Sequence, residues 1–158
     1  ENREMTAFWE HKTLYQMTTD EWESLCDGCG RCCLHKLEDI DTGHHFYNDV
    51  ACRLLDSTSC RCSLYATRKW IVSDCLVVRP DSEHEFAWLP VTCAYRRIYE
   101  GKPLDWWHPL VSGDPESLHI AGISVRDNVV NESEVNESDL EDHIFHWIDF
   151  LCSRVAWK

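Results

Sequence analysis

Hydrophobic residues follow a helical period in three short stretches of this 158-residue chain and show no lasting period elsewhere. Thr18 and Glu21 form a capping-box pattern, which predicts a short helix that leads into Cys26. The stretch VTCAYRRIYEG, residues 91–101, predicts a second helix that ends at its glycine. A further SxxE capping box begins a last predicted helix over about residues 139–152, and these apolar residues share one of its faces: Leu140, Ile144, Trp147, Ile148 and Leu151.

The middle of the chain carries weaker secondary-structure signals. Between residues 34 and 81 the pattern is irregular, with turn signals at 41–43 and 56–59 and only short apolar runs. Residues 123–130, ISVRDNVV, alternate enough to predict a short strand. We therefore expect a mainly α fold with long irregular segments and a few short strands, α+β at most, in a single domain that spans residues 1–158.

Cysteine changes this picture, because nine of the ten cysteines fall in residues 26–93. Four of them form the run CDGCGRCC with spacing CxxCxxCC, in which Gly28 and Gly30 allow the tight turns of a metal-binding knuckle. Clustered thiolates bind soft metals, so we expect a small metal-stabilised domain whose metal core is residues 26–93. The candidate metal ligands are these nine: Cys26, Cys29, Cys32, Cys33, Cys52, Cys60, Cys62, Cys75 and Cys93.

The grouping of these ligands and the identity of the metal stay open at this point. Nine thiols suffice for two four-sulfur sites with one spare, for a bridged two-metal site, or for one cluster plus structural thiols. Zinc and iron both accept thiolates, and CxxCxxC also begins a bacterial ferredoxin spacing, which makes an iron–sulfur cluster the alternative. We expect the adjacent side chains of Cys32 and Cys33 to diverge, so that they serve different metals or one of them does not bind. Cys152 is interpreted as a buried apolar residue.

Charge and hydropathy exclude several classes of protein. The formal net charge is −13, although nine basic residues nearly balance ten acidic ones between Cys26 and Arg97. So acidic a chain repels phosphate backbones, and we expect no nucleic-acid partner. No run of about twenty apolar residues predicts a membrane span. Residues 1–16 lack the pattern of a signal peptide, so we expect a cytoplasmic protein; a removed leader would favour disulfides instead.

Support for catalysis is weaker. His35, His44, His45 and His108 could complete a site or exchange protons, but a purely structural role is commoner for a histidine. The chain has no Gly-rich phosphate loop, no GxSxG elbow and no HExxH motif, so it is expected not to be an enzyme. Three hypotheses remain: a non-catalytic protein that binds zinc or iron, an iron–sulfur protein with a redox or enzymatic role, and a thiol sensor or metal-transfer protein. Nothing in the sequence identifies a protein partner.

The cysteine pattern resembles that of a known family. The segments CDGCGRCCLHK, VACRLL, CRCSLYATR, WLPVTCAYR and WHPLVSGD together resemble the YkgJ-type CxxCxxCC cysteine-cluster family, a zinc- or iron-chelating domain, and within it the bacterial YcgN branch. The resemblance runs from about Phe8 to Val130. It implies a small bacterial cytoplasmic protein that binds zinc or iron through this cluster, and it implies no known reaction. The family's usual Tyr-x-x-Arg-Pro becomes Tyr65-Ala-Thr-Arg68-Lys69 here, which changes the local turn.

Overall fold

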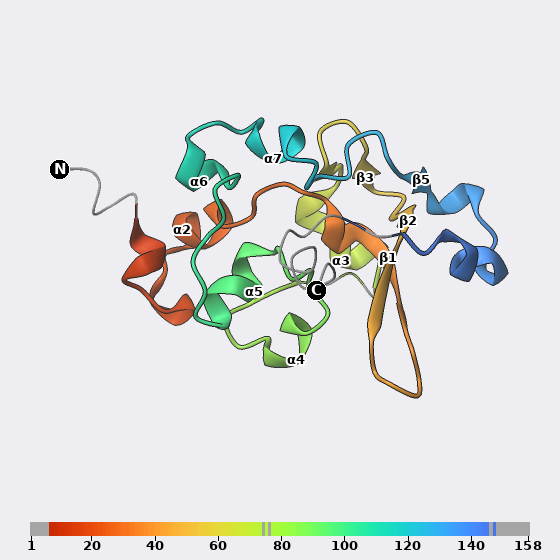
Figure 1. The fold of residues 1–158 in the computed structure, drawn as a ribbon, viewed down its shortest axis with the longest axis horizontal. Helices are drawn as coiled ribbons and strands as arrows, with labels where there is room; N and C mark the ends of the chain where they lie inside the picture. The colour runs from red at the N-terminus through yellow and green to blue at the C-terminus, as the bar shows by residue number, and fades with distance from the viewer. Residues whose placement is uncertain (1–6, 74, 76, 146, 148–158) are drawn as a thin grey trace, which may run out of the picture. The chain divides into compact units, whose positions relative to one another are not determined.

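Two compact units make up the chain in the computed structural model (Figure 1). The first unit joins residues 1–27 to residues 77–121, and the second joins residues 28–76 to residues 122–158. Each unit is therefore built from two separate stretches of sequence, and each is described by itself below. The structure describes residues 7–73, 75, 77–145 and 147.

The first unit is built from short helices connected by turns. The predicted capping box is confirmed: the Thr18 hydroxyl accepts a hydrogen bond from the Glu21 N–H, and the Glu21 carboxylate accepts one from the Thr18 N–H. The helices of this unit are the 3-10 helices η1 (Phe8–Glu10) and η2 (Leu14–Gln16) and the α-helices α2 (Thr19–Ser24), α4 (Glu83–Phe86), α5 (Ala94–Tyr99), α6 (Pro109–Ser112) and α7 (Ser117–Ile120).

The second predicted helix is confirmed as α5. Cys93 is its N-cap and lies just before the first turn. Gly101 follows the helix with φ +75°, a left-handed conformation that glycine adopts without steric cost. The predicted end of this helix is therefore also correct.

A buried histidine belongs to the core of the first unit. The His108 ring is 3% exposed; its Nε2 donates to the Leu25 carbonyl at 2.7 Å, and its Nδ1 accepts from the Leu110 N–H at 3.0 Å. His108 thus caps α6 and satisfies a buried carbonyl, which is a structural role. The apolar residues that form this core are Phe8, Leu14, Leu25, Phe86, Leu89, Ala94, Trp107 and Leu118.

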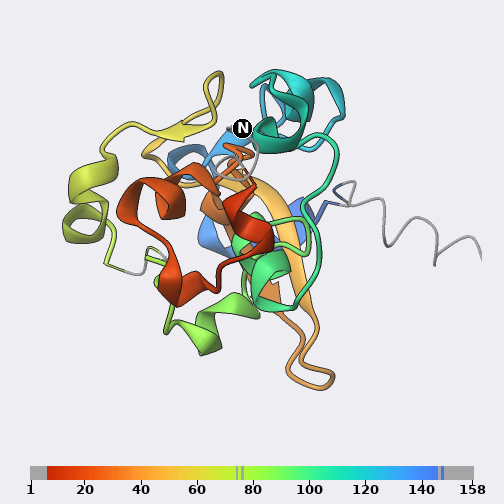
Figure 2. The same ribbon diagram turned by 90° about the vertical axis from the view of Figure 1, so that its left-hand side faces the viewer.

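A three-stranded sheet organises the second unit. Strands β1 (Leu34–Glu38) and β2 (His45–Ala51) form the antiparallel hairpin drawn in orange in Figures 1 and 2. Strand β5 (Val130–Asn131) pairs in parallel with the other edge of β2. Gly43, with φ +77°, lies in the hairpin turn that the sequence predicted.

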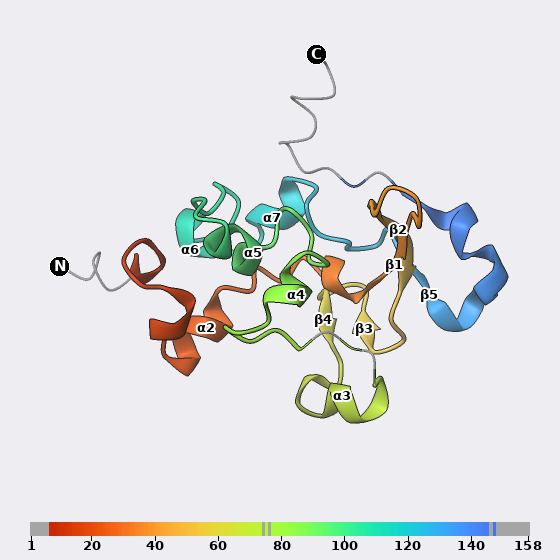
Figure 3. The same cartoon turned by 90° about the horizontal axis from the view of Figure 1, so that it is seen from below.

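A second, two-stranded sheet follows along the chain. Strands β3 (Leu55–Asp56) and β4 (Arg61–Cys62) pair antiparallel, and the chain continues into the 3-10 helix η4 (Tyr65–Thr67) and helix α3 (Arg68–Ile71), as Figure 3 shows. The remaining elements of the unit are the 3-10 helices η3 (Arg31–Cys33), η5 (Glu132–Glu134) and η6 (Glu137–His143). Its core cluster consists of Leu34, Ala51, Cys60 and Val125.

The fold is mixed α and β, so the expectation of a mainly α fold is wrong. The α-helices of the described residues reach only six residues, in α2 and α5, whereas strand β2 alone has seven. The stretch expected to be irregular, residues 34–81, contains β1 to β4. Strand β2 escaped prediction because its fully buried Asn48, whose side chain accepts from the Val50 N–H, breaks the apolar alternation.

Two smaller predictions are corrected as well. Within residues 123–130 only Val130 is in a strand; upstream, the Val125 N–H donates to the Cys29 carbonyl at 2.9 Å in a loop contact. The last predicted helix is a 3-10 helix at residues 137–143, after which Ile144 forms an isolated bridge with Asn48. The rest of that predicted helix, apart from Phe145 and Trp147, lies outside the described residues, as does Cys152.

Replacing Gly30 by alanine should destabilise the protein more than replacing Gly43. Both glycines have φ near +80°, so both replacements cost about 1 kcal/mol in backbone strain. At Gly30, however, a Cβ atom would lie 2.7 Å from Val125 Cγ2, whereas Gly43 faces open space. We expect Gly30→Ala to lose about 1–3 kcal/mol more unfolding free energy than Gly43→Ala, measured by urea unfolding. If both variants lost the same unfolding free energy, the contact between the added methyl group and Val125 would be relieved at no cost in stability.

Candidate metal centre

The CxxCxxCC run begins with a glycine-rich loop that is anchored within the second unit. Gly28 and Gly30 have φ of +82° and +80°, which confirms the turn conformations expected of them. Arg31 follows, 3% exposed, and its Nε donates to the Ile123 carbonyl at 2.8 Å. The Arg31 N–H also points to Cys29 Sγ at 3.4 Å. The loop therefore resembles a knuckle in its backbone, with Cys29 turned inward and buried.

Cys60 belongs to the apolar core of the second unit. It is 3% exposed, packs with Leu34, Ala51 and Val125, and its thiol forms a hydrogen bond with the side chain of Ser124. Burial raises its pKa, although that hydrogen bond and the nearby Arg126 oppose the rise. Cys60 is in addition one of two described non-glycine residues with positive φ, at 62°. These contacts are those of a packed core thiol.

Five other thiols lie near one another in the second unit, and we call them the five-thiol cluster. Cys33 is the link: its side chain is hydrogen-bonded to that of Cys32, and its carbonyl accepts from the Cys52 N–H at 2.8 Å. The expectation that Cys32 and Cys33 serve different metals, or that one of them does not bind, stays a prediction. The members of the five-thiol cluster, contributed by η3, the end of β2, β4 and the segment after α3, are Cys32, Cys33, Cys52, Cys62 and Cys75.

The thiols of the cluster influence one another's ionisation. The pKa of Cys33 is raised, first by its hydrogen bond with Cys32, then by burial, and then by the charges of Cys32, Cys52 and Cys62. Burial is the largest cause of the raised pKa of Cys75, and the same three neighbours add to it. A thiol whose neighbours resist its ionisation stays protonated unless a cation compensates the accumulated negative charge.

The donor set of the five-thiol cluster suits a soft metal ion in kind and in number. A tetrahedral zinc site or an iron–sulfur cluster takes four thiolates, and the cluster offers five. Within the described residues, no group of three or more His, Cys, Asp or Glu side chains is already positioned around a single metal-sized point. Loading would therefore require side-chain rotations that turn neighbouring sulfurs toward one ion.

The remaining predicted ligands occupy other places. Cys26 and Cys93 belong to the first unit, where Cys26 is exposed and Cys93 half-buried at the start of α5. Their roles as ligands stay predictions, as do those of Cys29 and Cys60 in the second unit.

Glu132 lies beside the five-thiol cluster, and sequence analysis did not identify it. Its carboxylate accepts from the His35 ring at 2.8 Å and from the Arg53 N–H at 2.8 Å, and the Arg53 guanidinium lies 3.3 Å away. Burial works against ionisation here, but these donors prevail and hold the pKa of Glu132 below its usual range. Its negative charge also helps raise the pKa of Cys52. Glu132 lies in the acidic stretch NESEV, whose residue types carry no recognisable ligand or catalytic spacing.

The other candidate histidines have ordinary local roles. His35 pairs with Glu132, as described, and the ring of His44 packs edge-on against Phe46 with centroids 4.5 Å apart. His45 lies 3.7 Å from the Glu38 carboxylate across the β1–β2 hairpin.

Among the described residues, no helix has the length and apolar character to cross a bilayer.

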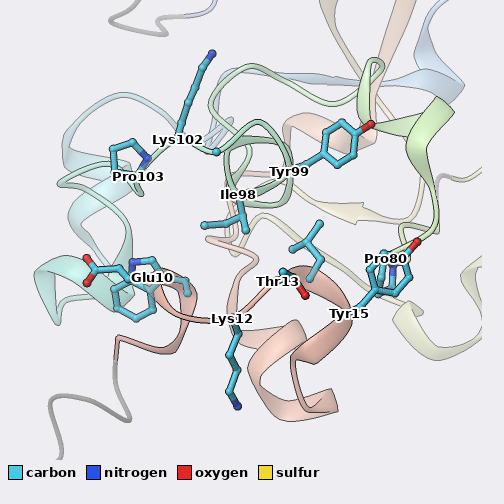
Figure 4. A pocket seen from close by; sticks show the side chains of 12 residues that line it. Glu10, Lys12, Thr13, Tyr15, Pro80, Ile98, Tyr99, Lys102 and Pro103 are labelled. Atoms are coloured by element: carbon cyan, nitrogen blue, oxygen red, sulfur yellow. The ribbon is translucent and has the colours of Figure 1, made fainter.

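A cleft of about 600 Å³ lies in the first unit, and Figure 4 shows it from close by. Its walls are formed by aromatic and proline side chains, among them Trp9, Tyr15 and Tyr99, with Lys12 and Lys102 at the edges. The lysines are already paired, Lys12 with Glu21 at 2.8 Å and Lys102 with Glu100 at 3.1 Å. None of the nine candidate cysteines lines this cleft, so it is separate from the thiol chemistry.

A knuckle followed by clustered thiols defines a cysteine-cluster metal-binding domain. Residues 25–94 match the family model CxxCxxCC, described as "Putative zinc- or iron-chelating domain". The chain belongs to the UPF0260 family of bacterial proteins. This membership supports metal binding and leaves open which metal is bound.

The relatives that show this cover nearly the whole chain. A UPF0260 protein of Rhizobium etli is 56% identical over 140 residues, which are 89% of this chain and 89% of that relative. One of Cellvibrio japonicus is 57% identical over 142 residues, 90% of this chain and 97% of that relative. One of Nitrobacter hamburgensis is 55% identical over 152 residues, 96% of this chain and 89% of that relative. No solved structure matches this chain.

Replacing Glu132 by glutamine should cost stability near neutral pH. The charged Glu132 carboxylate accepts hydrogen bonds from the His35 ring and from the Arg53 backbone N–H. A charge-assisted hydrogen bond that is sheltered from water contributes about 1.5–3 kcal/mol to stability. Because Glu132 is partly exposed, we expect a loss at the lower end of that range. Because its folded pKa is lowered, this contribution is present above the ordinary glutamate pKa and is lost as pH falls through the folded value.

Urea unfolding at pH 7 and again at acid pH measures this effect. We expect Glu132→Gln to be less stable than the wild type at pH 7 and the difference to shrink in acid. Glu134→Gln is the matched control, because Glu134 is exposed in the same 3-10 helix and should leave stability unchanged. A pH-independent loss would mean that shape, and not charge, is what Glu132 contributes.

Proposed function

We propose that this chain is a non-catalytic metal-binding protein that holds zinc or iron with thiolates of the five-thiol cluster. The observation that carries the proposal is the backbone geometry that brings these cysteines together: the Cys52 N–H donates to the Cys33 carbonyl at 2.8 Å, and Leu55, the strand partner of Cys62, donates its N–H to the Cys52 carbonyl at 3.0 Å. A divalent cation bound there would compensate the charge and displace the thiol protons. The family's description as a zinc- or iron-chelating domain supports the same function.

A structural role for the metal follows from the elements that supply the thiols. Cys52 follows β2, Cys62 ends β4, and Cys75 follows α3, so one ion would connect three separate segments of the second unit. Strands β3 and β4 have two residues each, and α3 has four. Elements this short are marginal by themselves, and metal–thiolate bonds would stabilise them. We propose a cytoplasmic protein with no nucleic-acid partner, as the charge predicts.

The alternative is an iron–sulfur protein with a redox or enzymatic role. Its ligand set would begin with Cys26, Cys29 and Cys32, whose CxxCxxC spacing is that of a bacterial ferredoxin, and Cys33 or a later cysteine would supply the fourth sulfur. Thiolate ligands do not separate zinc from iron. Elemental analysis with a visible spectrum, on protein purified without oxygen, distinguishes the two. Colourless zinc protein supports the first function, and brown protein with matching iron and sulfide supports the alternative.

Replacing cluster thiols should remove the metal. Cys62→Ser and Cys75→Ser each delete a sulfur of the five-thiol cluster, and we expect metal affinity to fall by more than the roughly 10–100-fold that an outer-shell change causes. Cys60→Ala is the matched control: its thiol is packed in the apolar core, so the variant should be less stable and yet keep its metal. If Cys60→Ala lost its metal while Cys62→Ser and Cys75→Ser kept theirs, the metal site would include Cys60 and would not be the five-thiol cluster.

Removing the metal should loosen the second unit selectively. In zinc-dependent folds the bound ion contributes on the order of 10 kcal/mol to folding. We therefore expect a strong chelator to reduce the circular dichroism signal and to open residues 28–76 to protease before the core around Leu25 and Trp107 is cut. Mass spectrometry of the fragments locates the cuts. An unchanged digestion pattern after complete metal removal would contradict a structural role.

A further inference from the structure

An exposed patch of aromatic and basic side chains lies on the η4–α3 segment of the second unit. Trp70 is 90% exposed, Tyr65 51% and Ile71 41%, values far above those of ordinary packed residues. Arg68 lies over the Tyr65 ring with its guanidinium carbon 3.8 Å from the ring centroid, and Lys69 is exposed beside it. We call these five residues the basic aromatic patch. Large apolar side chains gathered on a surface in this way mark an interaction site.

The charge of this patch contrasts with that of the whole chain. Residues 57–73 carry three cations, Arg61, Arg68 and Lys69, and no carboxylate, within a chain whose net charge is −13. An acidic molecule approaching this protein is repelled over most of the sequence and attracted here. Electrostatic complementarity of this kind orients a partner and raises its rate of association.

The same unit also carries a surface with the opposite character. Residues 132–142 contain six carboxylates and no lysine or arginine. Ile144 and Phe145 follow directly, each 46% exposed. We call the exposed carboxylates of η6, which are Glu137, Asp139, Glu141 and Asp142, together with these two apolar residues, the acidic apolar segment.

We propose that the basic aromatic patch of one molecule docks on the acidic apolar segment of a second copy of this chain. The two surfaces match in sign of charge, and each also offers exposed apolar side chains for burial. In Figures 1 and 3, α3 and the blue 3-10 helix η6 lie apart within the unit, so one molecule does not bring its own two surfaces together. A two-fold dimer would form the contact twice and would leave neither surface exposed to further copies.

Other occupants fit the same patch less well. Net charge does not separate these occupants, because a second copy carries the same −13 as the first; the local match does, since the phosphate surface of a nucleic acid or an anionic membrane offers no apolar side chains to pack against Trp70 and Ile71. The η4 and α3 helices have three and four residues, too short to lie in a membrane interface as an amphipathic helix. A second copy presents its acidic groups next to apolar ones, which is what the patch requires.

A charge-exchange experiment tests the contact in metal-loaded protein. One variant reverses the patch with Arg68→Glu and Lys69→Glu, and the other reverses the segment with Glu137→Lys and Glu141→Lys. We expect the wild type to sediment as a dimer at low salt, each variant alone to associate at least about tenfold more weakly, and an equal mixture of the two to recover dimerisation. The mixture is decisive because each reversed surface then meets a complementary one. High salt should weaken the wild-type dimer.

Two further measurements keep the result unambiguous. Trp70→Ser removes apolar area without touching charge and should also weaken the dimer, whereas Ile40→Ser, at a residue 95% exposed on the β1–β2 hairpin turn, is the matched control and should not. Metal content and circular dichroism of every variant show whether a loss comes from the metal centre. The proposal fails if the wild type is a monomer at low salt or if the reversed variants still form dimers. It also fails if Trp70→Ser leaves the dimer intact and abolishes only binding to anionic vesicles or to single-stranded DNA.

Discussion

The main constraint on the second unit is that several of its cysteine sulfurs share a small, half-buried region. The pKa of Cys33 is raised first by its hydrogen bond with Cys32, and those of Cys52 and Cys75 are raised first by burial; the charges of neighbouring thiols add to each rise. Metal binding and proton release are therefore one event. The surrounding fold has to hold the sulfurs near one another, and among the residues that the structure describes Leu34, Ala51, Cys60 and Val125 pack together behind them.

The local structure solves this with backbone geometry more than with packing. Gly28 and Gly30 take left-handed conformations, and the close approach of Gly30 to Val125 leaves no room for a side chain. Arg31 then ties the loop to the Ile123 carbonyl, a contact across more than ninety positions of sequence. Glu132 provides a second long-range tie, through His35 and Arg53, next to the thiols. The knuckle is thus positioned by residues from the far end of the chain, so mutations there should reach the metal centre.

Sequence analysis was reliable where the signal is local. The capping box at Thr18 and Glu21, the helix that ends before Gly101, and the turn conformations of the knuckle glycines all depend on residues a few positions apart, and the structure confirms them. The β1–β2 hairpin was missed because its apolar residues do not alternate regularly and because it buries an asparagine, Asn48, whose side chain accepts a hydrogen bond from the Val50 N–H. The mainly α expectation failed for the same reason: a strand paired through its backbone need not show an apolar alternation.

The sequence alone determined the chemistry of this protein, because thiol spacing is written directly in residue types: CxxCxxCC with further cysteines downstream indicates soft-metal binding whatever the fold. Which thiols become neighbours was decided only by tertiary structure. Cys33 and Cys52 are nineteen positions apart and yet share a backbone hydrogen bond, while Cys60, two positions from Cys62, is committed to the apolar core. Alternate residues of a chain project in different directions, so proximity in sequence could not show which thiols lie together; the backbone pairing of distant segments decided that.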